Sequence, residues 1–117
     1  MNWTKNDDTL VIVLVEDDYA QGTERLANTM ESMRIGHKCR HLLIFSSRTK
    51  LPDDEITLLA FRQTVATLGR ILRGERVAFV SVAITDVQLT FVNSLLGVDL
   101  PSMRVFQDAD TARQWVK

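Results

Sequence analysis

The strongest constraint on the fold is an uninterrupted apolar run at residues 9–15, with the sequence Thr-Leu-Val-Ile-Val-Leu-Val. A run of this kind is typical of a strand buried on both faces, as in a parallel sheet covered by helices. The turn cluster Asn6-Asp7-Asp8 precedes it, so residues 3–5 are expected to form an antiparallel hairpin partner at one edge.

Strand and helix patterns alternate along the rest of the chain. Further strands are predicted over residues 39–45, 77–84 and 103–106. Helices are predicted from the acidic cluster 16–18 to Gly36, and over residues 52–74, 85–97 and 108–116. Asp17 or Asp18, Thr85-Asp86 and Asp108 are the expected N-caps. This order predicts one α/β domain over residues 1–117, with a mostly parallel sheet of four to five strands and right-handed crossovers.

Composition excludes several classes of protein. The 117 residues carry 14 Lys and Arg against 15 Asp and Glu, and this near-zero net charge argues against a dedicated nucleic-acid binder. The longest apolar run is too short to span a bilayer, which takes roughly 20 residues. A single cysteine and the absence of a signal-peptide pattern favour a cytoplasmic location.

No catalytic constellation or cofactor motif is evident. His37, Cys39 and His41 form an H-x-C-x-H pattern, but ligands spread along one strand do not supply a tetrahedral site, so we expect no metal centre. The five glycines are isolated from one another, which excludes a glycine-rich phosphate loop. We therefore expect a protein that is not an enzyme and holds no cofactor.

Charge and apolar surplus both suggest an interaction surface. Residues 1–33 are predominantly acidic, whereas residues 34–50 hold five bases and no acid. Such a bipolar chain suits self-association or docking to a charged protein. Ile56 and Leu59 lie off the main apolar stripe of their helix, so a second face there is expected to form a homodimer contact or an apolar ligand cleft.

The end of the first strand resembles that of response-regulator receiver domains. Val13-Leu14-Val15-Glu16-Asp17-Asp18 is similar to their paired-acid motif. The later strands, however, end in Phe45-Ser46-Ser47 and Ala83-Ile84-Thr85, without the aspartate that a receiver phosphorylates. After Lys50 the next lysine is Lys117, so the receiver's lysine is also missing. A degenerate receiver domain is therefore an alternative hypothesis.

A second resemblance covers more of the chain. Residues 103–116 (MRVFQDADTARQWV) look like the last strand, acidic cap and Ala/Trp helix of SpoIIAA-like, STAS-related bacterial domains. Residues 76–80 are similar to their preceding strand. The resemblance implies an α/β sandwich that serves as a non-enzymatic regulatory, protein-interaction or small-ligand module. An apolar, lipid-like ligand beside the 56–72 helix is the alternative within this family.

The same resemblance directs attention to one switch region. Anti-sigma-factor antagonists of this superfamily phosphorylate a serine in a D-S-S-G-like motif at a helix N-terminus. Asp53 matches its aspartate, but Asp54 stands in the place of the serine. Asp54 is either a fixed negative charge in the place of phosphoserine or an ordinary helix cap. Ser46 and Ser47 are further candidate phosphorylation sites.

Overall fold

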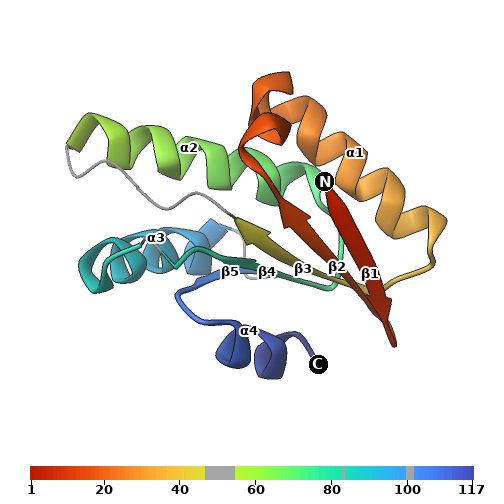
Figure 1. Cartoon of the computed structure of the whole chain (residues 1–117). Helices are drawn as coiled ribbons and strands as arrows, with labels where there is room; N and C mark the ends of the chain where they lie inside the picture. Colours follow the sequence, from red (N-terminus) through yellow and green to blue (C-terminus); the bar gives the residue numbers. More distant parts are fainter. Residues whose placement is uncertain (47–54, 83, 100–101) are drawn as a thin grey trace.

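The computed structural model describes residues 1–46, 55–82, 84–99 and 102–117, and its centre is a five-stranded sheet (Figure 1). The strands are β1 (Asn2–Asn6), β2 (Thr9–Leu14), β3 (His41–Ser46), β4 (Arg76–Val80) and β5 (Met103–Phe106). Their order in the sheet is the same as along the chain. β1 and β2 form an antiparallel hairpin, and β2 to β5 are parallel. The predicted α/β class, hairpin and mostly parallel sheet are therefore confirmed.

Helices cover the two faces of the sheet unequally (Figure 1). They are α1 (Thr23–Gly36), α2 (Glu55–Ile71), α3 (Asp86–Asp99) and α4 (Ala109–Val116), with a short 3-10 helix, η1 (Glu16–Gln21), before α1. Residues of α1, α2 and α3 share one core with the sheet, whereas α4 builds a second core on the opposite face. The strand alternation sends successive side chains into these two cores in turn.

The larger core lies under α1, α2 and α3. Leu10, Ile12 and Leu14 of β2 are fully buried there, with Leu26 and Met30 of α1 against them. Four further aliphatic side chains belong to this core. Leu68 lies in α2, Leu72 directly follows α2, and Val92 and Leu96 lie in α3. Burial of aliphatic side chains contributes about 1.5–3 kcal/mol each, so this face supplies most of the hydrophobic stabilisation.

The smaller core lies under α4. Leu43, Ala78, Val80 and Phe106 of the sheet pack with Ala112 and Val116 of the helix. α4 lies over β3, β4 and β5. The part of this face formed by β2 is less covered, and Val13 stays 38% exposed.

The acidic cluster at residues 16–18 does not begin α1 as predicted. It enters η1, and Asp18 Oδ2 accepts a hydrogen bond from the Val15 N–H at 2.7 Å, so this carboxylate stabilises the turn after β2. α1 begins at Thr23, after Gly22, whose φ of 91° favours glycine. No side chain caps that helix among the described residues.

Other predicted boundaries were also wrong. The helix predicted to end at Gly74 ends at Ile71, and the strand predicted from Cys39 begins at His41. The strand predicted over residues 77–84 ends at Val80, because the chain turns and the Ile84 N–H donates to the Ser81 carbonyl oxygen. Val82, inside the predicted strand, is 71% exposed. α3 runs through Gly97, the expected stop, and ends at Asp99.

The predicted caps of the last two helices are confirmed. The Thr85 hydroxyl accepts a hydrogen bond from the Gln88 N–H, and the Gln88 side chain accepts one from the Thr85 N–H. This reciprocal pair is a capping box. The Asp108 carboxylate accepts a hydrogen bond from the Thr111 N–H at 2.9 Å, which lowers the pKa of Asp108.

Candidate functional site

The predicted switch region is only partly within the described structure. Ser46 is half-buried at the end of β3, where it pairs with Leu14 of β2. Ser47, Asp53 and Asp54 lie outside the described residues, so their proposed roles stay predictions.

The apolar face predicted for α2 is likewise only partly within the described structure. Ile56 and Leu59 lie within α2, but their side chains are outside what the structure describes. Leu68 in α2 and Leu72 just after it are in the large core. An apolar cleft or dimer contact at Ile56 and Leu59 therefore stays a prediction.

The H-x-C-x-H residues do not converge. His37 is the C-cap of α1, and Lys38 follows it with a φ of 57°, which turns the chain before the strand begins. Cys39 is 3% exposed in the large core, as a small hydrophobic residue. His41 alternates with the core residue Leu42 and lies on the opposite face of the sheet. Among the described residues, no group of three or more His, Cys, Asp or Glu is placed to hold a metal ion.

Two arginines of the basic segment, Arg34 and Arg40, pair with acidic residues. Arg34 forms a two-pronged ion pair with Glu31 and donates a third hydrogen bond to the Cys39 carbonyl oxygen. Arg40 lies 2.7 Å from Glu75 and 3.9 Å from Asp8, and its hydrogen bond lowers the pKa of Glu75. The acidic and basic parts of the sequence therefore meet at this end of the sheet.

β1 forms an open edge of the sheet. All five residues of β1 are exposed, and the sheet ends with this strand. The hairpin turn makes Asn6 and Thr9 a hydrogen-bonded pair, so the backbone N–H and C=O groups of Trp3 and Lys5 are directed away from β2. Unpaired strand edges of this kind are templates for pairing with another chain.

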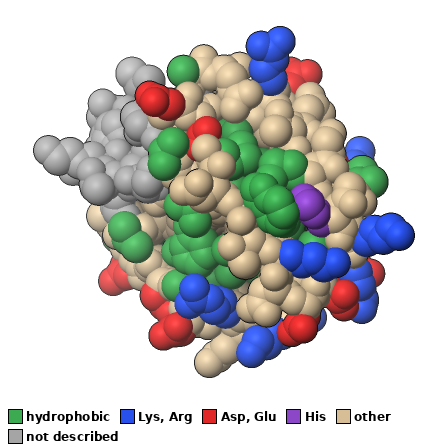
Figure 2. Space-filling view, turned by 45° about the vertical axis from the view of Figure 1, so that its right-hand side comes forward, with side chains coloured by type: hydrophobic (Ala, Val, Ile, Leu, Met, Phe, Trp, Pro, Cys, Tyr) green, Lys and Arg blue, Asp and Glu red, His purple; other side chains and the backbone are tan. Residues whose placement is uncertain are grey.

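An aromatic pair reinforces the edge of β1. Trp3 is 47% exposed, and its ring centroid lies 4.2 Å from that of His37 at the end of α1. Figure 2 brings the β1 side of the molecule forward and shows hydrophobic side chains gathered at its centre, with a histidine beside them and charged groups around. Partly exposed tryptophans are frequent anchors in protein interfaces.

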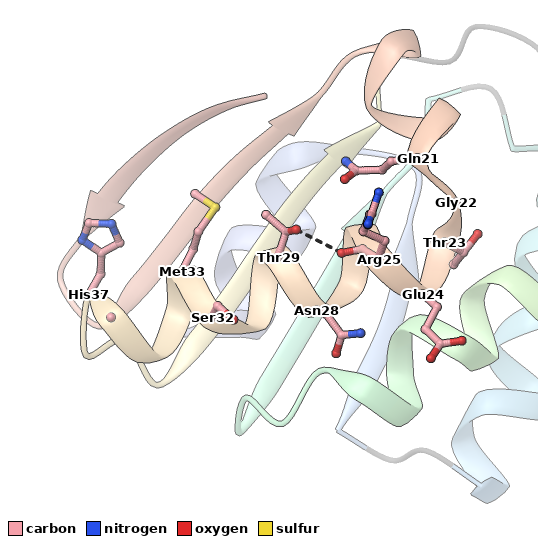
Figure 3. Close-up of a pocket in the computed structure, with 11 residues that line it drawn as sticks. Gln21, Gly22, Thr23, Glu24, Arg25, Asn28, Thr29, Ser32, Met33 and His37 are labelled. Atoms are coloured by element: carbon pink, nitrogen blue, oxygen red, sulfur yellow. Dashed lines mark hydrogen bonds between the residues drawn. The ribbon is translucent and has the colours of Figure 1, made fainter.

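A shallow groove of about 1120 Å³ runs along the outer face of α1 (Figure 3). Its lining changes from Gln21 and Arg25 at one end to His37 at the other. Between them lie small or unbranched residues: Asn28, Thr29, Ser32, Met33 and Gly36. His37 belongs to both the groove and the aromatic pair, so the groove and the β1 edge form one continuous surface, which we call the β1–α1 surface.

The opposite edge of the sheet is occupied. Asn93 of α3 donates a hydrogen bond from Nδ2 to the Val105 carbonyl oxygen and accepts one from the Val105 N–H, both at 2.9 Å. The amide thus satisfies two backbone groups that β5 would otherwise present to another strand. Asn93 therefore covers the β5 edge at Val105, whereas β1 has no such side chain bonded to its outer edge in the described structure.

The β1–α1 surface was not predicted from the sequence. Its signal is the order of residues in β1, Asn-Trp-Thr-Lys-Asn, which has the same residue at both ends and a central threonine. That pattern gains meaning only when β1 is known to be an edge strand.

Comparison with known proteins does not identify the chain. No protein-family model matches it, and no match was found among curated proteins. Within the described residues, none of the helices has the length and apolar character required to cross a membrane.

Proposed function

We propose that this chain is a non-enzymatic regulatory module of the SpoIIAA-like type that acts through protein interaction, and that its partner at the β1–α1 surface is a second copy of itself. The observation that carries this proposal is that a side chain bonds to the outward backbone groups of one edge strand but not to those of the other. β1 is exposed along its whole length, whereas Asn93 occupies the backbone groups of Val105 in β5. The order of residues in β1 favours self-pairing over pairing with an unrelated strand.

In an antiparallel pair of β1 strands centred on Thr4, polar residues of the same kind face each other and the two Lys5 side chains are kept apart. In this register Thr4 faces Thr4, Asn2 faces Asn6, and Trp3 faces Lys5 of the second copy. Threonine pairs are favourable across antiparallel strands, and a lysine beside a tryptophan ring adds a cation–π contact. Lys5 is the only charged residue of β1, and it does not meet its own copy in this register.

The same two-fold relation places the two α1 helices side by side. Both lie on the same face of the continuous sheet, next to the pairing strands. The small residues Thr29, Ser32 and Gly36 along the groove permit a close approach of the helices. The dimer would therefore bury the groove together with the strand edge.

The family assignment within this proposal rests on the last part of the chain. β5 leads through the Asp108 cap into α4, where Ala112 is buried and the Trp115 ring packs 5.5 Å from that of Phe106. The order of strand, acidic cap and helix with Ala and Trp is what the resemblance to SpoIIAA-like domains implies for residues 103–116, and it supports the proposal. A regulatory role follows from that resemblance.

The register is tested by cysteine cross-linking. With Thr4→Cys, two cysteines would face each other at about 4.5 Å between Cα atoms, which suits a disulfide. Mild oxidation should convert most of this variant to a covalent dimer. Asn6→Cys is the matched control, because residue 6 pairs with residue 2 and the two introduced thiols would lie roughly 13 Å apart along the strands. The native Cys39 is buried and does not compete.

A proline variant tests the strand edge itself. Lys5→Pro removes an N–H directed away from β2, so the hairpin is retained while pairing with a second copy is blocked. Sedimentation analysis should find a monomer for this variant and a dimer for Lys5→Val, which keeps the N–H. A monomeric unaltered protein at 100 µM, together with equal cross-linking of Thr4→Cys and Asn6→Cys, would refute self-association.

A further inference from the structure

A second cavity lies away from the β1–α1 surface, on the face of the sheet that carries α4. Its volume is about 380 Å³, within the range of small-ligand pockets. The hairpin turn at Asp7 and Asp8 lines it from one element and the last turn of α4 from another. It therefore lies where β2 and β3 begin.

Apolar side chains line the base of this cavity. Leu43 of β3 and Val116 of α4 are buried beside it, and Val11 of β2 is half-buried. Val11 and Leu43 are register partners and project to the same face of the sheet. A ligand in the cavity would thus meet hydrocarbon on one side.

Opposite charges come from different elements around the cavity. α4 and the residue after it contribute Arg113 and Lys117, and the hairpin contributes Asp7 and Asp8. Arg40 also lines the cavity, and its charge is paired with Glu75. The ion pairs of Arg113 and Asp8 are long: Arg113 lies 3.6 Å from the exposed Asp110, and Asp8 lies 3.9 Å from Arg40. The Arg113 guanidinium also lies over the Phe45 ring. Within the part of the chain that the structure describes, neither Asp7 nor the Lys117 side chain has an ion-pair partner.

His41 also lines the cavity, and one of its ring nitrogens is buried away from solvent. Its Nδ1 is buried and has no hydrogen-bond partner among the described residues. Burial is the main cause that lowers the pKa of His41, and the positive charge of Arg40 is the next cause. Buried polar atoms without a partner are rare in folded proteins and require an explanation.

We propose that this cavity binds a small zwitterion with an apolar body, the chemistry of an aliphatic α-amino acid. The carboxylate lies toward Arg113 and Lys117, and the ammonium group lies toward Asp7 and Asp8. The side chain of the ligand rests on the apolar base. Both charges of the ligand are needed, because an anion alone would be opposed by the hairpin acids and a cation alone by Arg113 and Lys117. This assignment is independent of self-association through β1.

Calorimetric titration with L-leucine tests the proposal. Two probes keep the branched hydrocarbon and lose one charge each: 4-methylpentanoate lacks the ammonium group, and 3-methylbutylamine lacks the carboxylate. Leucine should bind at least tenfold more tightly than either probe. Absence of leucine binding at 10 mM, or equal affinity for leucine and 4-methylpentanoate, would overturn the assignment.

Two substitutions locate the site. Arg113→Gln should weaken leucine binding at least tenfold, whereas Arg70→Gln on α2, on the other face of the sheet, should leave it unchanged. Asp7→Asn keeps the hairpin turn, because asparagine tolerates the φ of 54° at this position. It should weaken leucine binding and leave 4-methylpentanoate binding equal or stronger. Unchanged leucine affinity in both Arg113→Gln and Asp7→Asn would place the ligand elsewhere.

Discussion

The two edges of the sheet differ in how their backbone groups are satisfied. At β5, the side chain of Asn93 takes the place of a neighbouring strand, with two hydrogen bonds of 2.9 Å to Val105. At β1, the outward groups of Trp3 and Lys5 have no such partner within the described structure, and every residue of the strand is exposed. A side chain therefore satisfies the β5 edge at Val105, whereas the β1 edge has no such side chain within the described structure. This contrast locates the proposed interface at β1.

Asn93→Ala should have the largest effect on stability, because it removes the side chain that bonds to the β5 edge and leaves both edges without such a partner. Both backbone groups of Val105 would lose their partners, and we expect the free energy of unfolding to fall by about 3 kcal/mol. Urea denaturation followed by circular dichroism measures this loss. Ser94→Ala, at an exposed neighbouring position, is the control and should change stability by less than about 0.5 kcal/mol. A similarly small change for Asn93→Ala would show that the hydrogen bonds between Asn93 and Val105 are not needed for stability.

Trp3→Ala tests the open edge. Loss of the ring removes its contact with Lys5 of the second copy, and we expect the dimer dissociation constant to rise about tenfold, or about 1.4 kcal/mol. Sedimentation equilibrium provides the measurement. Val82→Ala removes another exposed apolar side chain away from β1 and should leave the constant unchanged. Equal effects of the two substitutions would argue against a specific role for Trp3.

Thr85→Ala should have a smaller effect on the closed edge. Thr85 and Gln88 cap the helix that carries Asn93, and loss of such a cap costs about 1 kcal/mol. Thermal or urea unfolding should detect this change. Thr90→Ala within the same helix is the comparison, and it should be neutral because alanine is a strong helix former. An unchanged free energy of unfolding in Thr85→Ala would mean that the hydrogen bonds between Asn93 and Val105 do not depend on the cap.

The smallest expected effect concerns pH. Burial lowers the pKa of His41 in the folded protein. Histidine in the unfolded chain takes up a proton near pH 6.5, so the unfolded state binds more protons below that pH and folding stability decreases. The urea midpoint should therefore fall between about pH 7.5 and 5.5, and fall less in His41→Gln. The lowered pKa of Glu75 acts at more acidic pH and does not overlap. Identical pH profiles would exclude His41 as the source.

Regular elements were predictable where the local pattern agreed with the tertiary structure. The strand Met103–Phe106 was predicted with the observed bounds, and the Asp108 cap was identified, because a short apolar run and an acidic residue carry local signals. The end of β4 was not predictable from its apolar run. Ile84 is apolar because it is buried after the turn, and the strand itself ends at Val80, level with Phe106 at the end of the neighbouring strand.

The candidate site depends on relations that a single sequence does not display. The positive φ of Lys38 breaks the strand alternation that would have placed His37, Cys39 and His41 on one face. Likewise, Asn93 lies on an amphipathic helix without any mark of its role, because its partner is a backbone segment twelve residues later. Such contacts follow from the position of α3 beside β5.

The matching order of the strands in space and along the chain has a consequence for synthesis. During translation each new strand leaves the ribosome after the strand it pairs with, so the sheet can extend one strand at a time without inserting a segment between two others. α3, with Asn93, also precedes β5. Asn93 is therefore already synthesised when β5 emerges, and it can bond to Val105 as soon as β5 joins the sheet.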